Sequence, residues 1–313
     1  MSPYPIVLGH EGAGVVEKVG ENVSQFKKGD HVVLSYAMCG ECDQCLKGFP
    51  ASCVRLNELC FGGKMIDGTH RIELEGKEVS TFFGQSSFAK YSVVNYLHAV
   101  KVDPEVDLKL LGPLGCGIQT GAGTVLNRLR PETGSTIVIT GAGAVGLSAV
   151  MAAKIAGCLN IIAVDIHENR LTLAKELGAT HIVNSKETDL VEFVQKLTSS
   201  AGAEYALDTT GVPAVVKQAL NSTGTRGTLA VVGATGDVTF NIQQEVMGMG
   251  RSVIGVVEGD AIPKIFIPQL VEYYKQGRFP FDKLTKYFEF KDIEKAFHAS
   301  ESGEIIKPIL TFE

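Results

Sequence analysis

TIVITGAGAVGLSAVMAAKIAGCLNIIAVD, residues 136–165, decides the fold of this chain. Near its start, Ile137, Val138 and Ile139 form a short β-branched apolar run, which is typical of a strand buried on both faces. A glycine-rich turn in G-x-G-x-x-G spacing follows, and residues 145–156 then predict an alanine-rich helix. A second strand is predicted over residues 161–164, with Asp165 at its carboxyl end. The stretch therefore predicts a strand–turn–helix–strand unit of a parallel sheet.

Each residue of the turn has a physical task in a dinucleotide site. Gly141 allows the tight turn, Gly143 lets the backbone approach a pyrophosphate, and Gly146 lets the helix pack closely on the strand. The helix N-terminus offers free N–H groups and partial positive charge to phosphates. Asp165 would accept a hydrogen bond from a ribose 2′-hydroxyl, as in NAD sites. The alternative is a bare βαβ turn without a ligand.

Composition limits the class of protein and its partners. The chain has 313 residues, 45% hydrophobic and 20% charged, which predicts an ordinary globular protein of about two domains. A net charge of −6 without a basic stripe argues against nucleic acid or an anionic membrane as partner. The uncharged run 133–153 is interpreted as strand, turn and helix, not as a membrane span. We find no secretory signal at the N-terminus, so we expect a cytoplasmic protein whose seven cysteines are thiols or metal ligands.

The chain changes character near residue 115. Before it the sequence is β-rich, with strands expected at 13–19, 31–34, 71–74 and 91–94. Residues 116–257 alternate strands and helices; beyond residue 165 we expect helices at 168–177, 189–197 and 213–220, and strands at 181–183, 205–208, 228–232 and 252–256. Six strands of this kind predict an α/β fold with a doubly wound parallel sheet. The tail, 258–313, has helical stretches at 265–276 and 292–300 and an apolar strand at 305–312, and it is expected to rejoin the first domain.

Four cysteines form a second pattern. Cys39, Cys42, Cys45 and Cys53 have the spacing C-x2-C-x2-C-x7-C in a glycine-rich loop. Four thiolates so close in sequence can surround one tetrahedral zinc ion, which is the structural type of site. Disulfide bonds are the alternative, and the lack of an export signal argues against them.

A third candidate site joins distant residues. His10 and Glu11 lie in a glycine-spaced segment, and Cys116 lies in GPLGCGIQTGAG just before the nucleotide-binding pattern. Taken alone, His10 is interpreted as a surface histidine and Cys116 as a buried thiol. Taken together, they could be ligands of a catalytic zinc. Cys60 and Cys158 lack metal-ligand spacing and are interpreted as packing residues.

Several motifs together give the chain a family resemblance. From about Pro5 to Phe312 it resembles the zinc-dependent medium-chain alcohol dehydrogenases, most closely the aryl-alcohol (benzyl-alcohol) branch. The resemblance rests on the four-cysteine loop and on these segments: GHEGAGVVEKVG (9–20), FFGQSSFAKY (82–91), GPLGCGIQTGAG (112–123), GAGAVGLSAVMAA (141–153), AVDIHENR (163–170) and RFPFDKL (278–284). It implies a Rossmann domain at 116–257 and a β-rich GroES-like catalytic domain made from 1–115 and 258–313.

The resemblance also implies roles for individual residues. His10, Glu11 and Cys116 match positions at the catalytic zinc. Positions that match contacts to NAD fall into three groups. Those lining the nicotinamide or the phosphates are Thr120, Val145, Val232 and Gly233; those at the adenosine ribose are Asp165 and Arg170; the pyrophosphate contact is Lys307. Phe82 and Phe83 match a wall of the substrate pocket, where flat rings would suit an aromatic alcohol.

One departure from the family pattern concerns the N-terminus. The family carries another catalytic-zinc cysteine upstream of the GHE motif, followed by a hydroxyl and a histidine that relay the proton. In this sequence few residues precede His10, and no cysteine occurs before Cys39. The expectation is a chain truncated at the N-terminus, with an incomplete β-rich domain and reduced turnover of alcohols.

The function implied is zinc-dependent oxidation of a primary alcohol to its aldehyde, with hydride transfer to NAD. The alcohol is expected to be aromatic or allylic, and the enzyme a homo-oligomer, a dimer or tetramer. Two alternatives stay open: a glutathione-linked formaldehyde dehydrogenase on the same scaffold, and a catalytically inactive, truncated NAD-binding protein.

Overall fold

The computed structural model describes residues 2–312, which form two compact units. The first unit contains the chain up to Gln119, Asp260–Gly277 and the chain from Phe281 onward. The second contains Thr120–Gly259 and Arg278–Pro280. Residues 116–119 thus lie with the first unit and residues 258 and 259 with the second, a division a few residues different from the predicted one.

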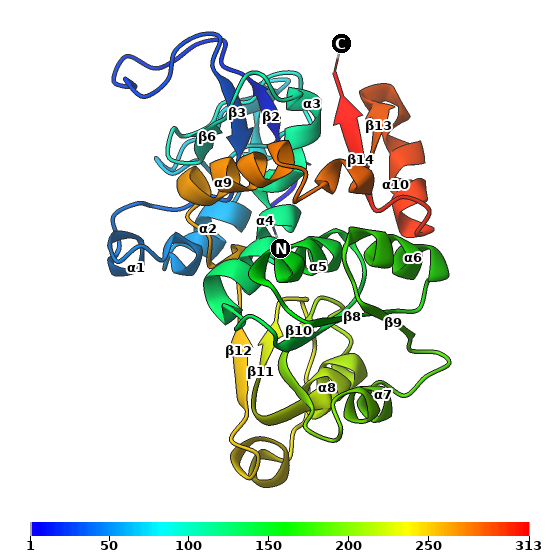
Figure 1. Ribbon diagram of the computed structural model, residues 1–313. Helices are drawn as coiled ribbons and strands as arrows, with labels where there is room; N and C mark the ends of the chain where they lie inside the picture. Colours follow the sequence, from blue (N-terminus) through cyan, green and yellow to red (C-terminus); the bar gives the residue numbers. More distant parts are fainter. Residues whose placement is uncertain (1, 313) are drawn as a thin grey trace. The chain divides into compact units, whose positions relative to one another are not determined.

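The second unit is built on a six-stranded parallel sheet (Figure 1). In sheet order its strands are β12 (Ser252–Gly255), β11 (Thr223–Val231), β10 (Ala203–Asp208), β7 (Thr136–Thr140), β8 (Asn160–Asp165) and β9 (His181–Asn184). The order reverses at β7, because the chain adds β8 and β9 on one side and β10 to β12 on the other. Ligands of such sheets bind at the carboxyl ends of the strands at this switch point. The predicted doubly wound sheet is confirmed.

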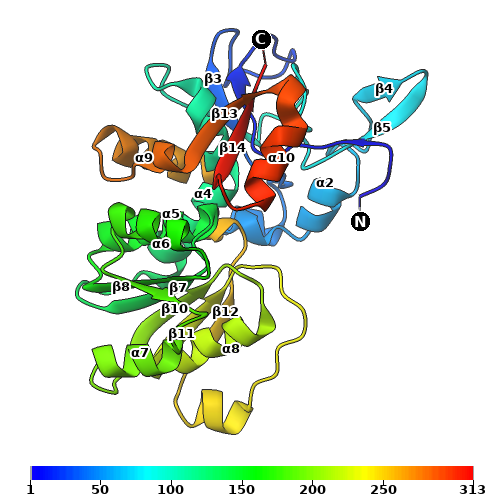
Figure 2. The same cartoon turned by 90° about the vertical axis from the view of Figure 1, so that its right-hand side faces the viewer.

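Helices cover both faces of this sheet. Figure 2 shows α5 and α6 on one face and α7 and α8 on the other. Their bounds are α5 (Ala144–Ala156), α6 (Glu168–Leu177), α7 (Leu190–Leu197) and α8 (Pro213–Ser222). Two short π-helical segments, η3 (Thr124–Leu129) and η4 (Ile242–Met247), complete the unit. Because helices pack on both sides, β7 is buried along its whole length, which explains the apolar run at its centre, residues 137–139.

The first unit is β-rich and contains three small sheets. The sheet orders are β1-β5-β4, β2-β3-β6 and β13-β14. The strands are β1 (Ile6–Val7), β2 (Ala13–Val15), β3 (His31–Leu34), β4 (Ile72–Leu74), β5 (Lys77–Thr81), β6 (Ala99–Lys101), β13 (Thr285–Glu289) and β14 (Lys307–Thr311). The predicted return of the C-terminal strand to this unit is observed, since β14 pairs in parallel with β13.

Helical segments connect these sheets. The α-helices are α1 (Asp43–Leu46), α2 (Leu56–Phe61), α3 (Leu108–Leu111), α4 (Gly117–Gly123), α9 (Pro263–Lys275) and α10 (Ile293–Glu301). The 3-10 segments are η1 (Pro50–Ser52), η2 (Gly112–Gly115), η5 (Glu258–Asp260), η6 (Phe281–Leu284) and η7 (Phe290–Asp292). The boundary between the two units falls inside α4.

Two predictions for the β-rich part were wrong or too long. Residues 91–94 form a loop, in which Tyr91 is 74% and Val93 58% exposed. The predicted strand at 13–19 ends at Val15, because the pairing becomes irregular where the Val16 N–H bonds to the Asp30 carbonyl. Both segments alternate apolar and polar residues, which predicted strands. Among the described residues, however, neither residues 91–94 nor the part beyond Val15 has a partner strand with regular pairing.

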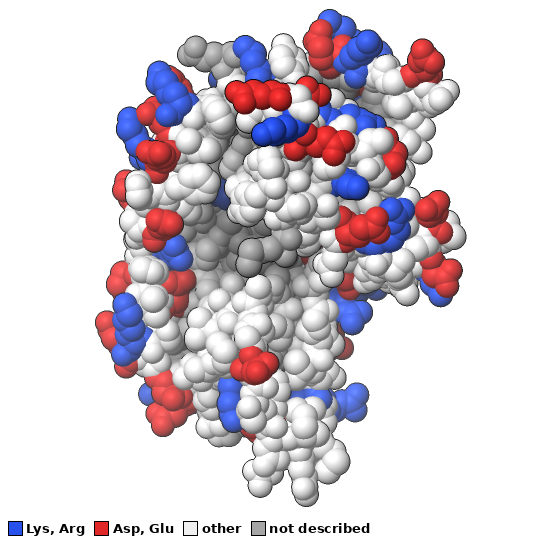
Figure 3. All heavy atoms as spheres, turned by 180° about the vertical axis from the view of Figure 1, so that it is seen from behind, with Lys and Arg blue, Asp and Glu red and all other residues white. Residues whose placement is uncertain are grey.

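The length of the helices and the distribution of surface charge bear on which partners the protein can have. Within residues 2–312 no helix has both the length and the apolar content needed to cross a bilayer. On the face shown in Figure 3, Lys and Arg side chains are interspersed with Asp and Glu. Opposite charges therefore lie close together and screen one another over this face.

The glycine turn fixes where α5 begins relative to β7. A Cβ atom on Gly146 would lie 1.8 Å from the Gly141 carbonyl oxygen, whereas a Cβ on Gly143 would have no heavy atom within 4 Å. Gly143 is the N-cap of α5, with φ −83°. The third glycine of the motif is thus required by packing, and the second leaves open space at the helix N-terminus.

We predict that Gly146→Ala lowers the free energy of unfolding although alanine favours helix. Alanine gains about 1 kcal/mol in helix propensity, but a Cβ this close to the Gly141 carbonyl oxygen forces α5 to move, and such overpacking costs typically about 1–3 kcal/mol or more. Gly143→Ala is the matched control, with an expected change under about 0.5 kcal/mol. Urea unfolding of the three proteins measures this; a Gly146→Ala protein as stable as the parent would contradict it.

Candidate active site and metal centres

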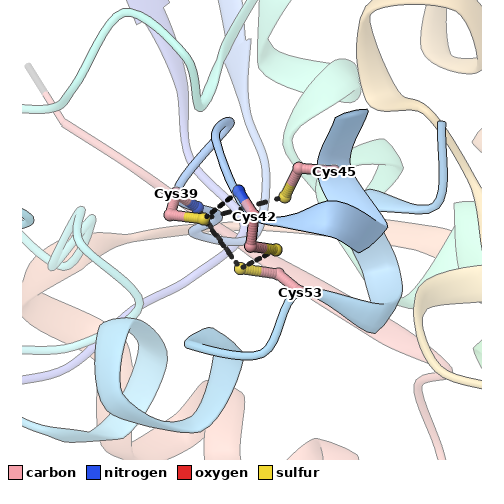
Figure 4. Close-up of side chains that lie close together, drawn as sticks. All are labelled: Cys39, Cys42, Cys45 and Cys53. Carbon is pink, nitrogen blue, oxygen red and sulfur yellow. Dashed lines mark hydrogen bonds between the residues drawn. The ribbon is translucent and has the colours of Figure 1, made fainter. Parts of the chain in front are cut away.

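The four predicted cysteine ligands converge in one loop of the first unit. Cys42 is the N-cap of α1, Cys45 lies within α1, and Cys39 and Cys53 flank this segment (Figure 4). The Sγ–Sγ distances are 3.9 Å for Cys39–Cys45, 4.0 Å for Cys42–Cys53 and 3.5 Å for Cys39–Cys53. A zinc ion with Zn–S bonds of about 2.3 Å places tetrahedral sulfurs about 3.8 Å apart. The cluster therefore fits such an ion, and none of its cysteines is in a disulfide.

Backbone N–H groups and burial act on these thiols in opposite directions. Hydrogen bonds from the backbone at Cys45 and Val54 lower the pKa of Cys42 to about 6. Burial raises the pKa of Cys45 to about 12. The Cys39 N–H also bonds to the Cys53 Sγ at 3.4 Å. A divalent cation would supply the charge that lets all four ionise together.

The second group of potential ligands also lies in the first unit. One ligand atom from each of His10, Glu11 and Cys116 lies within 4.8 Å of the others. Glycines bring these segments together, since a Cβ on Gly112 would lie 2.4 Å from the Glu11 carbonyl oxygen and one on Gly115 would lie 2.0 Å from the Leu34 carbonyl oxygen. The GPLGC segment must be glycine-rich because its backbone packs directly on the backbone beside Glu11.

Glu11 is held by two partners. Its Oε2 lies 2.5 Å from the Lys307 Nζ, and its Oε1 accepts a hydrogen bond from the Gly117 N–H at 2.9 Å. The Lys307 and Glu11 side chains are 22% and 16% exposed, so this ion pair is largely shielded from water. Lys307 thus neutralises the charge of Glu11 in this structure. The contact of Lys307 with the cofactor's pyrophosphate stays a prediction.

Gln85 fixes the backbone around His10, and the sequence analysis missed it. Its Nε2 donates to the His10 carbonyl at 2.9 Å, and its Oε1 accepts from the Gly12 N–H at 3.2 Å. The same Nε2 lies 3.2 Å from the Ser35 carbonyl oxygen. Gln85 is 2% exposed. A polar amide inside FFGQSSF was the signal that could have been used, because a buried amide needs several partners.

Two aromatic rings contact the His10 imidazole, and a third ring packs against both of them. The ring centroids of Phe82 and Phe83 lie 5.6 and 4.6 Å from that of His10. Phe61, which was not predicted, lies 5.9 Å from Phe82 and 5.1 Å from Phe83. Burial among these rings lowers the pKa of His10, against the opposing effect of Glu11. The neutral imidazole, which can ligate a metal, is thereby favoured.

The predicted cofactor residues of the second unit gather at the switch point of its sheet. Asp165, 8% exposed, accepts hydrogen bonds from the backbone N–H groups of Ala142, Ile166 and His167 at 2.7, 2.7 and 3.0 Å. A carboxylate has about four acceptor positions, so one direction remains for a ribose hydroxyl. The buried Nε of Arg170 has no hydrogen-bond partner among the described residues.

The remaining cofactor candidates lie around the same strand ends. A Cβ on Gly121 would lie 1.9 Å from the Val145 carbonyl oxygen, so the segment after Thr120 packs on the first turn of α5. The Val232 N–H bonds to the Asp208 carbonyl at 3.0 Å, and Gly233 packs against the backbone of Gly211. These contacts follow β10, which pairs with β7, and β11, which is the next strand beyond β10 in the sheet.

Comparison with known proteins decides the family. The "Zinc-binding dehydrogenase" family matches residues 144–273, and the "Alcohol dehydrogenase GroES-like domain" family matches residues 1–104. The geraniol dehydrogenase of Castellaniella defragrans is 43% identical over 99% of this chain and 84% of its own length. This chain belongs to the zinc-dependent medium-chain alcohol dehydrogenases.

Two solved structures of this alcohol dehydrogenase family agree with the fold. The alcohol dehydrogenase zinc-binding domain protein from Burkholderia ambifaria has a TM-score of 0.96 at 51% identity, with 99% of this chain and 85% of that chain covered. The benzyl alcohol dehydrogenase from Acinetobacter calcoaceticus has a TM-score of 0.95 at 46% identity, with 100% and 86% covered. The family and the GroES-like and Rossmann folds predicted from sequence motifs are confirmed.

The residues present fit the zinc ions and the NAD that membership of this family implies. The cysteine cluster has the donor set and the spacing of a closed zinc site. His10, Glu11 and Cys116 offer nitrogen, oxygen and sulfur donors, and fewer protein ligands than four leave a position open for substrate. For NAD, the orphaned Arg170 Nε and the open space beside Gly143 fit a ribose and a phosphate.

We predict that Cys45→Ser lowers the zinc content by about one ion per chain and lowers stability with it, because a closed zinc site needs four ligands. Cys158→Ser is the control, since this buried thiol lies in the second unit beside Ser135. Elemental analysis of purified protein, with thermal unfolding in parallel, measures both effects. Equal zinc content in Cys45→Ser and parent would contradict the assignment.

Proposed function

We propose that this chain oxidises a primary aromatic or allylic alcohol to its aldehyde and transfers hydride to NAD. The observation that carries the proposal is the aromatic cluster beside His10, in which Phe82 and Phe83 contact the imidazole and Phe61 packs against both of these rings. A flat, apolar substrate would gain from contact with these rings, while the ligand group beside them handles the hydroxyl. The relatives that dehydrogenate benzyl alcohol and geraniol support the same substrate class.

The ligand group would act through zinc. His10, Cys116 and Glu11 would hold the ion, which supplies Lewis-acid chemistry toward the alcohol oxygen when bound. Burial keeps the imidazole neutral for this task. Lys307 and the Gly117 N–H hold the Glu11 carboxylate in place, so its availability as a ligand depends on exchange with these partners.

The rings would exclude water and orient the substrate. Phe82 and Phe83 meet at a centroid distance of 4.8 Å and 54°, which gives a continuous apolar wall beside the imidazole. An alcohol lying on this wall presents its hydroxyl toward His10 and its hydrocarbon part toward the rings. When bound, NAD would accept the hydride that leaves the carbinol carbon, and the hydroxyl proton would be released to water.

Substrate preference tests this proposal. We expect kcat/KM for benzyl alcohol and for an allylic primary alcohol to exceed that for ethanol, because burying an aromatic ring gains about 2–3 kcal/mol over a two-carbon chain. Phe82→Ala should lower kcat/KM for benzyl alcohol by about tenfold or more and affect ethanol less. Phe290→Ala, which removes an exposed ring stacked on Phe312, is the matched control.

Initial-rate measurements with purified, zinc-loaded protein check this. Ethanol turned over as efficiently as benzyl alcohol would contradict the aromatic preference. S-(hydroxymethyl)glutathione belongs in the same panel, and its preferential turnover would favour the glutathione-linked alternative. Binding of NAD without turnover of any alcohol in the panel would favour the inactive alternative.

Asp165 should select NAD over NADP. If its carboxylate holds the adenosine ribose, it would repel a 2′-phosphate, and Ile166 after it provides no cation. We expect NAD to bind about 10–100-fold more tightly than NADP. Asp165→Gly should bring the Kd values for NAD and NADP closer together. The variant also loses the hydrogen bonds to the glycine turn, but this loss weakens both cofactors alike and leaves the ratio of their Kd values unchanged. Calorimetric Kd values for both cofactors measure it, and equal affinities in the parent would refute the assignment.

A further inference from the structure

The turn that carries Phe82 and Phe83 has a strained backbone. Phe83, Gly84 and Ser86 have φ values of 53°, 62° and 49°. This left-handed conformation is unfavourable for a bulky aromatic residue, and it persists only where the surrounding structure holds it. Strained residues of this kind concentrate at active sites and ligand clamps. The contacts that hold this turn therefore decide where the Phe83 ring lies.

The Ser86 hydroxyl connects the two ends of the turn to the neighbouring strand. Its Oγ accepts a hydrogen bond from the Phe82 N–H at 2.9 Å and donates one to the Val7 carbonyl at 2.7 Å. Ser86 is 2% exposed, so water does not compete for these bonds. One buried hydroxyl thus acts as donor and acceptor at once and joins the residue before Phe83 to β1.

The strand joined in this way leads directly to His10. The Ser87 N–H donates to the Gly9 carbonyl at 3.0 Å. A Cβ on Gly9 would lie 2.4 Å from the Phe88 backbone nitrogen, so only glycine permits this close approach. The segment before His10 is therefore aligned with the segment that begins at Ser86, and a shift of the turn changes the distance between its rings and the imidazole.

The other side of the turn rests on the core around the cysteine loop. The Phe83 N–H donates to the Cys60 carbonyl at 2.8 Å, and Phe83 packs against the buried cluster that contains Cys60 and Ala37. A Cβ on Gly84 would lie 3.4 Å from the Ala37 Cβ. These contacts hold the turn against the core, and the Ser86 hydroxyl holds the same turn against β1.

We propose that Ser86 is a positioning residue that determines the preference for flat, apolar alcohols, because its hydroxyl holds the Phe83 ring against the His10 imidazole. The two ring centroids lie 4.6 Å apart, and Phe83 forms one wall with Phe82. A wall that is already held in place binds a substrate without a further cost of ordering its side chains. Ser86 is buried and acts through the turn, not by contact with the substrate. This inference rests on the proposed oxidation of alcohols at the His10 group.

Ser86→Ala tests this inference through substrate selectivity. The variant leaves the buried Phe82 N–H and Val7 carbonyl without their partner, so the turn is expected to relax from its strained conformation. We expect the ratio of kcat/KM for benzyl alcohol to kcat/KM for ethanol to fall by about tenfold, while kcat/KM for ethanol itself falls by less than about threefold. Most of the loss should appear as a higher KM for benzyl alcohol, because the wall binds the substrate and the transition state alike.

Two further variants complete the comparison. Ser86→Gly also lacks the hydroxyl but adopts a positive φ without steric cost, so it should lose the same selectivity and carries the test if Ser86→Ala does not fold. Ser302→Ala is the matched control, because the Ser302 Oγ donates to the Ala299 carbonyl at 3.2 Å in the same unit. This control should keep the selectivity ratio of the parent. Thermal unfolding of all variants checks that they fold.

The NMR signal of the His10 Cε1 proton gives a second readout that does not depend on turnover. An aromatic ring shifts the resonance of a proton beside it, so displacement of Phe83 should move this signal in both Ser86 variants. The signal is identified by its loss in His10→Gln. His181, whose ring centroid lies 6.1 Å from that of Phe193 in the second unit, is the internal reference and should keep its shift. Spectra of histidine-labelled proteins are compared at equal zinc content.

The outcomes separate this inference from the proposed function. A parent that turns over neither alcohol would overturn the proposed function, and the His10 signal would then still decide whether Ser86 places the ring. In an active parent, unchanged selectivity in Ser86→Gly would overturn the role of Ser86 alone, whether or not the His10 signal moves. Equal losses for benzyl alcohol and ethanol would also overturn it, because they would show a general structural role.

Discussion

The arrangement of the second unit depends on places where one backbone lies directly on another. The closest is at Gly146, where even a methyl group would lie 1.8 Å from the Gly141 carbonyl oxygen. Gly121 meets the Val145 carbonyl in the same way, so the first turn of α5 is enclosed by two glycines. Asp165 then ties the turn to β8 through the Ala142 N–H. The N–H groups at the start of α5 are therefore oriented before any phosphate arrives, which lowers the cost of ordering this backbone on binding.

In the first unit, backbone segments also pack directly on one another at glycines around the potential ligand residues. Gly112 and Gly115 bring the backbone before Cys116 against Glu11 and Leu34, while Gln85 connects His10, Gly12 and Ser35. These contacts involve backbone atoms and one buried amide, which do not titrate. The positions of the backbone segments around the site thus do not depend on the protonation of a side chain. The placement and charge of the ligand side chains do depend on protonation, because His10 is buried, with its pKa lowered, and Glu11 is paired with Lys307.

The sequence predicted what local pattern and spacing determine. Strand and helix periods, the glycine turn and the cysteine spacing are set by neighbours along the chain, and β3 and α6 occur at the predicted residues. Residues whose roles come from long-range contacts were missed: Phe61 and Gln85 are separated by many residues from His10 in sequence. The strand β13 was missed because its partner, β14, follows a helix, and the exposed pattern of Thr285–Glu289 lacks clear alternation. The strain at Phe83 has no sequence signal, since nothing in a phenylalanine predicts a positive φ.

The Glu11–Lys307 ion pair has a consequence for the order in which the protein assembles during synthesis. The four cysteines emerge from the ribosome within one short segment, and the loop that they close carries little entropic cost. The second unit is nearly continuous in sequence and can form as soon as β12 is made. Glu11, by contrast, waits for Lys307 and for the pairing of β13 with β14, almost a whole chain later. Until then its carboxylate is uncompensated, so the nascent protein presents an anionic group beside His10 that the finished protein neutralises. All four thiols of the cysteine loop are therefore available for a metal ion before Lys307, the partner of Glu11, has been synthesised.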